Sequence, residues 1–231
     1  MNSPLASHVL FHFGPVPVSS AVAVTWVIMA LLLLAALAVT RRLRLVPSTR
    51  QAVLELLVST IDAQIRDTMQ AEPEPYRALI GTLFLYILAA NWSSLVPGIE
   101  PPTGQLATDA ALAGIVFCAT IFFGMRTRGV KGYLETFAEP TWVMIPLNLV
   151  EQLTRTFSLI VRLFGNVMSG VFVVGIALSL AGLLVPIPFM ALDLLTGAIQ
   201  AYIFSMLAMV FIGATVSHDP YPLKKAGVSN E

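Results

Sequence analysis

The chain has 231 residues, of which 57% are hydrophobic and 11% charged, and its formal net charge is zero. A soluble domain needs a more polar surface than this composition provides, so the sequence predicts a membrane-embedded protein. The absence of a net positive charge gives no support to nucleic-acid binding. The single cysteine, Cys118, lies in an apolar run, which excludes an internal disulfide and disfavours a thiolate metal site.

Five apolar segments are long enough to cross about 30 Å of hydrocarbon as helices. In chain order they cover residues 19–40, 78–96, 107–125, 141–184 and 186–216. No internal repeat is visible, so the sequence does not support the inverted-repeat plan of many transporters. The chain is therefore predicted to be a single all-α membrane domain with five membrane-crossing helices.

A helix of a different kind is predicted at residues 48–70, between the first two apolar segments. Its apolar residues recur at helical spacing, at Leu54, Leu57, Val58, Ile61 and Ile65. Polar residues occupy the rest of the helix surface, which is typical of an amphipathic helix. We expect this helix on the cytoplasmic side, either on the membrane surface or against a neighbouring helix.

The distribution of basic residues predicts the orientation. Lys and Arg follow the first, third and fifth apolar segments, whereas residues 97–106 and 182–188 contain none. Cytoplasmic loops of membrane proteins carry the excess of basic residues. Residues 1–18 are therefore expected outside, and residues 217–231 are expected to form a cytoplasmic tail.

The fourth segment, 141–184, is too long for one upright crossing. As a helix it would measure about 65 Å at about 1.5 Å per residue. Two crossings would place Lys224 and Lys225 outside, against the charge distribution. We therefore expect one strongly tilted helix there, and a second tilted helix at 186–216.

Polar residues of the fourth segment are predicted to share one helix face. At about 100° per residue they fall within about 40° of Arg162. They are Glu151, Arg155, Ser158, Arg162, Asn166 and Ser169. On the fifth segment, Asp193, Gly197 and Gln200 share a face by the same arithmetic. Ionisable groups inside a membrane often mark ion pathways.

Simpler roles are open for the same residues. Glu151 and Arg155 are spaced for an ion pair within one helix, and Arg155 can also reach the membrane interface. The side chains of Ser158, Asn166 and Ser169 can hydrogen-bond between helices. Arg162 can form a buried pair with Asp193 on the next helix.

The predicted topology places the two acids on opposite sides of Arg162. Glu151 is expected on the cytoplasmic side and Asp193 on the outer side. Two acids separated by a fixed cation make two half-paths with a barrier between them, so a crossing ion needs a moving carrier. The sequence offers no such carrier.

Two stretches carry a resemblance to a known family. PLNLVEQLTRTFSLIVRLFGN (146–166) and PIPFMALDLLTGAIQAYIFSMLAMVFIGA (186–214) resemble subunit a of F-type ATP synthases, the membrane stator of the rotary motor. RLFGN, the acid eleven positions before its arginine and the IQAYIF sequence carry this resemblance, which extends over essentially the whole chain. It implies an ion-translocating subunit with no catalytic residue, no cofactor and no metal.

The resemblance also implies roles for individual residues. Arg162 matches the arginine that faces the rotor ring of c subunits, whose carboxylates carry H⁺ or Na⁺. Asn166 and Gln200 match polar positions near that arginine, and Glu151 matches the acid attributed to the cytoplasmic half-channel.

The chain departs from the family pattern at two positions. Val171 stands where many members carry an acid or a histidine, and Asp193 stands where others have histidine, glutamate or glycine. We therefore expect Asp193 to take the outer-channel role. Ser158 and Ser169 complete the expected set of ion-translocation residues.

The implied partners are the c-subunit ring, the b-subunit peripheral stalk, the other ATP synthase subunits and the lipid bilayer. The implied location is an energy-coupling membrane, either a bacterial plasma membrane or an organelle membrane. Two alternatives are a self-contained ion channel or small transporter, and a scaffold that anchors a membrane complex. A channel would conduct ions when the chain is alone in liposomes, whereas a stator without its ring would not.

Overall fold

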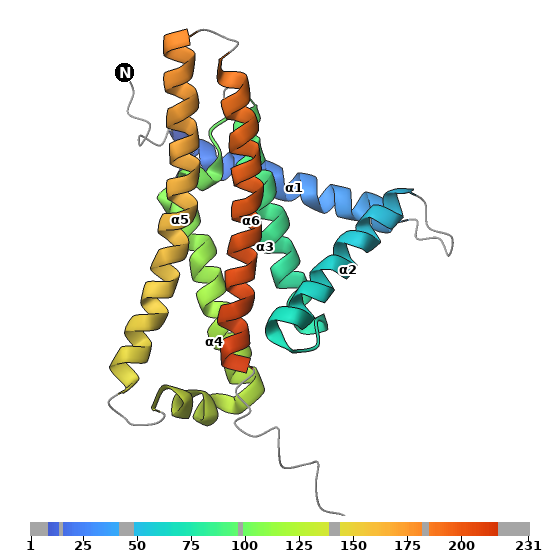
Figure 1. Ribbon diagram of the computed structural model, residues 1–231, viewed down its shortest axis with the longest axis vertical. Helices are drawn as coiled ribbons and strands as arrows, with labels where there is room; N and C mark the ends of the chain where they lie inside the picture. Colours follow the sequence, from blue (N-terminus) through green and yellow to red (C-terminus); the bar gives the residue numbers. More distant parts are fainter. Residues whose placement is uncertain are drawn as a thin grey trace, which may run out of the picture.

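The computed structural model describes residues 9–13, 16–41, 49–96, 99–138, 144–181 and 185–216. This part of the chain contains six α-helices (Figure 1). They are α1 (Ser20–Thr40), α2 (Thr49–Met69), α3 (Glu74–Trp92), α4 (Leu106–Ala138), α5 (Met144–Ala181) and α6 (Pro186–Val216). Two short 3-10 turns, η1 (Ser93–Leu95) and η2 (Pro102–Gly104), connect α3 to α4. The predicted tail, 217–231, lies outside the described residues.

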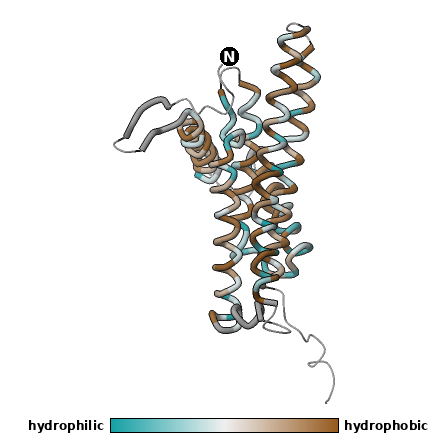
Figure 2. The backbone as a smooth tube through the Cα atoms, turned by 90° about the vertical axis from the view of Figure 1, so that its left-hand side faces the viewer, coloured by the Kyte–Doolittle hydropathy of each residue, from teal (hydrophilic) through white to brown (hydrophobic). Residues whose placement is uncertain are grey.

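Five of these helices are long and apolar enough to span a membrane, and they confirm the predicted all-α membrane domain. The candidate spans are Ser20–Ala38, Glu74–Leu95, Leu106–Val130, Ile145–Leu180 and Pro186–Val216. Figure 2 shows hydrophobic residues along most of their length, interrupted by shorter hydrophilic stretches.

A short β-hairpin precedes the helices, which the sequence analysis did not predict. Strands β1 (Val9–Phe13) and β2 (Val16–Ser19) pair in an antiparallel manner. Both are rich in valine or phenylalanine, residues that favour extended backbone. The hairpin lies within the segment 1–18 and at its boundary with α1, so it leaves the helical membrane domain unchanged.

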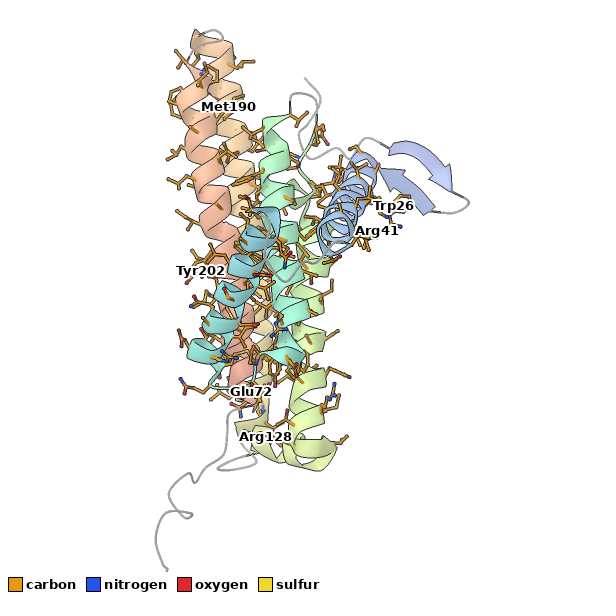
Figure 3. All side chains as sticks on the ribbon, turned by 90° about the vertical axis from the view of Figure 1, so that its right-hand side faces the viewer. Trp26, Arg41, Glu72, Arg128, Met190 and Tyr202 are labelled. Atoms are coloured by element: carbon orange, nitrogen blue, oxygen red, sulfur yellow. The ribbon has the colours of Figure 1, made fainter. Side chains whose placement is uncertain are left out.

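Helices α5 and α6 run antiparallel and side by side along the long axis, with α3 and α4 packed alongside them (Figure 1). In Figure 3, Glu72 and Arg128 lie at one end of the bundle and Met190 lies towards the other. The shared core is formed by apolar side chains from α2 to α6. Fully buried members include Ile65, Ile80, Ile87, Val116, Leu163, Phe204 and Ile212.

Helix α2 packs against α3 and α6 through its C-terminal half. Ile65 and Met69 are almost completely buried, whereas Leu56, nearer the N-terminus, is exposed. The guanidinium of Arg77 on α3 binds the Asp62 carboxylate with two hydrogen bonds of 2.5 and 2.6 Å. The amphipathic helix therefore contacts its neighbours through the face that the spacing predicts.

Helix α4 contains a bend at Gly129. Its φ of 74° and ψ of 165° are not helical, and a residue with a side chain rarely adopts this φ. The straight part of α4 therefore ends after the predicted span, 107–125, and the chain changes direction near its basic residues.

The helix lengths and angles favour the predicted tilt of α5 and α6. Helix α1 has 21 residues, about 32 Å, which matches the hydrocarbon thickness when the helix stands upright. Helices α5 and α6 have 38 and 31 residues, about 57 and 47 Å, and they lie at a large angle to α1 (Figure 1). If α1 stands upright, the two longer helices must be inclined.

Candidate functional site

The polar stripe of α5 lies on a side of the helix that the rest of the chain leaves largely uncovered. Leu159, Leu163 and Val167 form the buried side of the helix. Ser158, Arg162 and Ser169 are exposed. Only 11% of the residues in the most apolar window of this helix are buried. In the membrane, this surface must therefore be covered by lipid or by another protein.

Arg162 lies near the midpoint of α5 and is exposed. Among the described residues, its guanidinium has no hydrogen bond or ion pair, so the predicted alternative of a pair with Asp193 does not form. A charged side chain at the centre of a membrane costs about 2.5–3.5 kcal/mol or more when it faces lipid. The surface around Arg162 is therefore unsuited to lipid and suited to a polar or acidic protein partner.

Asp193, in the second turn of α6, lies against α5. Its Oδ2 accepts a hydrogen bond of 3.1 Å from the Ser94 hydroxyl in η1. Its Oδ1 occupies the space beside Gly170, where an added Cβ would overlap this oxygen and lie 2.8 Å from Cγ. The absence of a side chain at residue 170 therefore allows the carboxylate of α6 to approach α5.

A cavity of about 140 Å³ lies between α5 and α6 at this point. Its polar lining comes from Asn166, Ser169, Asp193 and Thr196, and the remainder is apolar. A single water molecule needs about 10–15 Å³ of such space and two to four polar partners. The cavity is therefore large and polar enough for water, and it brings three of the predicted residues together.

The contact between Gly170 and Asp193 sets the register of the two antiparallel helices. Counting seven residues from each places Gln200 opposite Leu163, one residue from Arg162. Gln200 is buried, and its Nε2 has no hydrogen-bond partner among the described residues. Asp193 lies about 12 Å from Arg162 along α5, because eight residues separate Gly170 from Arg162.

Glu151 lies on the other side of Arg162, eleven residues earlier and about 16 Å away along the helix. It accepts a hydrogen bond from Arg155, so the ion pair that the spacing allows is formed. The Arg155 guanidinium also lies 5.4 Å from the ring centroid of Phe211 on α6. An acid therefore flanks Arg162 on each side.

Several polar groups in the bundle were not predicted from the sequence. The buried Asn91 donates to the Gly197 carbonyl at 2.9 Å and accepts a hydrogen bond of 2.8 Å from Thr103. Asp109, on α4, is fully buried. Its position inside an apolar segment was a sufficient signal, because an acid there is a functional candidate by default. The bonds of Asn91 join residues far apart in the chain, so spacing could not predict them.

The described residues contain no cluster of three or more histidine, cysteine or acidic side chains that could hold a metal ion. The five long apolar helices define a polytopic membrane protein, with a polar cavity between two of them. The family model described as ATP synthase A chain matches residues 22–213. The chain therefore belongs to the ATP synthase A chain family.

Relatives of known name match along almost the whole chain. ATP synthase subunit a 2 of Bradyrhizobium sp. (strain BTAi1 / ATCC BAA-1182) is 53% identical over 215 residues, which cover 93% of this chain and 96% of the relative. ATP synthase subunit a of Albidiferax ferrireducens is 42% identical, covering 93% of this chain and 94% of the relative. ATP synthase subunit a 1 of Chlorobaculum parvum is 46% identical, covering 89% and 92%.

The family confirms the resemblance seen in the sequence. The chain is an integral membrane subunit of an ATP synthase, without catalytic function of its own, and serves as a stator in ion translocation.

Proposed function

We propose that this subunit provides two half-paths for H⁺ or Na⁺ that meet at Arg162, where a rotor carboxylate exchanges its ion. The observation that carries the proposal is the position of Arg162. It is a permanent cation, exposed at the midpoint of an apolar helix and without an ion pair among the described residues. A ring of c subunits, each with a carboxylate at that depth, is the partner whose chemistry fits this surface.

The outer half-path is assigned to the cavity between α5 and α6. Asp193, Asn166 and Ser169 line it about one to two helical turns from Arg162. The cytoplasmic half-path is assigned to the side of Glu151, with Ser158 between this acid and the arginine. Gln200 lies level with Arg162 on the neighbouring helix. Its Nε2 has no hydrogen-bond partner among the described residues and can therefore donate to a bound ion's water or to a rotor carboxylate. This assignment rests on the N-terminus lying outside.

The exchange follows from electrostatics. A rotor carboxylate is neutral while it holds its ion, and it becomes charged when it meets a nearby cation, so the ion leaves. Arg162 does not give up its own proton. It therefore blocks direct transfer from one half-path to the other. An ion passes only by travelling on the ring.

The proposed partners also include a b-subunit peripheral stalk and the lipid bilayer. The exposed apolar surfaces of α1 and α2 are available for the membrane segment of a b-subunit peripheral stalk and for lipid. The membrane is an energy-coupling one, with the C-terminus on the cytoplasmic side.

The test is Arg162→Ala in the assembled complex, reconstituted in liposomes. Ion-driven ATP synthesis should fall to background, because nothing then releases the rotor ion. Arg162→Lys should recover little, since lysine is a flexible point charge and can lose its proton. Subunit content provides the control for assembly. Near-normal coupled synthesis by a fully assembled Arg162→Ala complex would refute the proposal.

A further inference from the structure

Asp109, in the first turn of α4, is a buried acid that the proposed half-paths do not use. Its side chain is fully buried. In the part of the chain that the structure describes, neither Oδ1 nor Oδ2 has a hydrogen-bond partner. An unpaired carboxylate inside a membrane protein is costly. This carboxyl must therefore hold a proton or pair with a cation.

Among the residues that the structure describes, few ionisable groups lie near Asp109. Tyr86 on α3 lies near Asp109, and its neutral hydroxyl shares a hydrogen bond of 3.2 Å with Thr25 on α1. Helix α1 carries no charged residue. Glu100, ahead of α4, accepts a hydrogen bond of 3.4 Å from Ser20.

The remaining helices packed on α4 do not supply a counter-charge to Asp109. On α5, Glu151 and Arg155 pair with each other, and Arg162 is exposed. On α6, Asp193 bonds to Ser94. Asp109 is therefore poised to take up a small cation, and none of the basic side chains on these helices pairs with it.

Polar contacts connect the region of Asp109 to the cavity between α5 and α6. Thr103 lies in η2, immediately before α4, and its hydroxyl donates to Asn91. Asn91 donates in turn to the carbonyl of Gly197, one helical turn after Asp193 on α6. Asp109 follows Thr103 by six residues and Asp193 precedes Gly197 by four, so the two acids lie at the same end of the bundle, next to the segments that Asn91 joins.

We infer that Asp109 is a second acid on the outer half-path, which takes up the transported cation before it reaches the cavity at Asp193. The carboxylate accepts H⁺ from the outer side to become a carboxylic acid, or binds Na⁺ as its counter-ion. It releases the same cation towards that cavity. The inference rests on the proposed function, since it requires the outer orientation of this end of the bundle.

The experiment compares Asp109→Asn with Asp109→Glu in the complete complex in liposomes. ATP synthesis is measured at several outer pH values, each with and without Na⁺. Asp109→Asn removes cation exchange and preserves shape, so synthesis should fall about tenfold or more. With H⁺ as the cation, the loss should increase as the outer pH rises. With Na⁺, it should appear as a higher Na⁺ requirement at constant pH.

Asp109→Glu keeps an ionisable carboxyl and should retain much of the rate, with a shifted dependence on pH or Na⁺. The matched control is Asp67→Asn, the same substitution at an exposed acid on α2, which should leave synthesis unchanged. If assembled Asp109→Asn or Asp109→Glu complexes follow the wild-type profile at every pH and Na⁺ level, the inference is overturned.

A second measurement does not depend on the variants. A membrane-permeant carbodiimide, which attacks protonated carboxyl groups, is applied to the wild-type complex, and modified residues are identified by mass spectrometry. Modification of Asp109 should decrease as the outer pH rises or as Na⁺ is added. A complete absence of modification would overturn the inference.

The Arg162→Ala complex distinguishes a failure of the proposed function from a failure of the role of Asp109. If Arg162→Ala still synthesises ATP, the proposed function fails. If Arg162→Ala is inactive and Asp109→Asn matches the wild type, only the role of Asp109 fails.

Discussion

Gly170 and Asp193 illustrate how one missing side chain allows a carboxylate to reach a neighbouring helix. The carboxyl group of α6 fills the place beside α5 that a Cβ of residue 170 would take. The next residue, Val171, stands where many family members carry an ionisable side chain, and here it is exposed and does not line the cavity. The carboxylate of Asp193, which reaches α5 from α6, can take the place of an acid carried by α5 itself at residue 171.

Gly170→Ala should displace the Asp193 carboxylate from the cavity and slow ATP synthesis several-fold. The overlap costs about 1–3 kcal/mol if the helices do not separate. The matched control is Gly175→Ala on the same helix, where an added Cβ meets no atom within 4 Å. ATP synthesis by purified, fully assembled complexes is the measurement. Equal rates for the two variants would contradict a role for this contact.

At the scale of single residues, the sequence predicts Arg162, Glu151 and Asp193 as site residues, because charges are rare in apolar segments. It could not predict the hydrogen bond between Ser94 and Asp193, whose residues are 99 positions apart. Asp109 could have been found by the same reasoning as Asp193. Asp109 lies in the third apolar segment, whereas the predicted acids lie in the last two.

At the scale of elements, hydrophobic length and periodicity predicted the long helices of the described residues, although α4 continues past the predicted span, 107–125, to Ala138. The apolar face of α2 was predicted from its spacing, and its packing against α3 and α6 confirms one of the two expected arrangements. The bend of α4 depends on the backbone of Gly129, and the hairpin β1–β2 depends on local preferences in a short segment. Neither feature follows from the 3.6-residue period of a helix.

Asp62→Asn should loosen α2 from α3. The side chains of Asp62 and Arg77 are joined by two short hydrogen bonds but remain partly exposed, so solvent screening keeps the expected loss of stability small. Limited proteolysis of the complex should cut the α2–α3 connection faster than in the wild type. Asp67→Asn, on the same helix, is the control. Unchanged cleavage in Asp62→Asn would show that the pair does not hold α2.

At the scale of the whole molecule, two groups of helices have different orientations. Helix α1 lies at a large angle to α5 and α6 (Figure 1). Arg162 on α5 remains exposed. The sequence predicted the tilt from segment length alone. It could not predict which helices pack on α5 and which leave its polar stripe exposed, because that depends on contacts between distant segments.

The central claim is that Arg162 divides two aqueous half-paths, and thiol accessibility from each side of the membrane tests it most directly. Ser158→Cys and Ser169→Cys lie on the same face of α5, four residues before and seven residues after Arg162. Each is introduced with Cys118→Ser, which removes the single native cysteine of this chain, and labelling is read on this subunit. A small membrane-impermeant thiol reagent is then added to one side of vesicles that contain the complete complex.

We expect Ser169→Cys to react with reagent from the outer side and Ser158→Cys with reagent from the cytoplasmic side. Reaction of both cysteines from the same side would contradict the division of the path at Arg162.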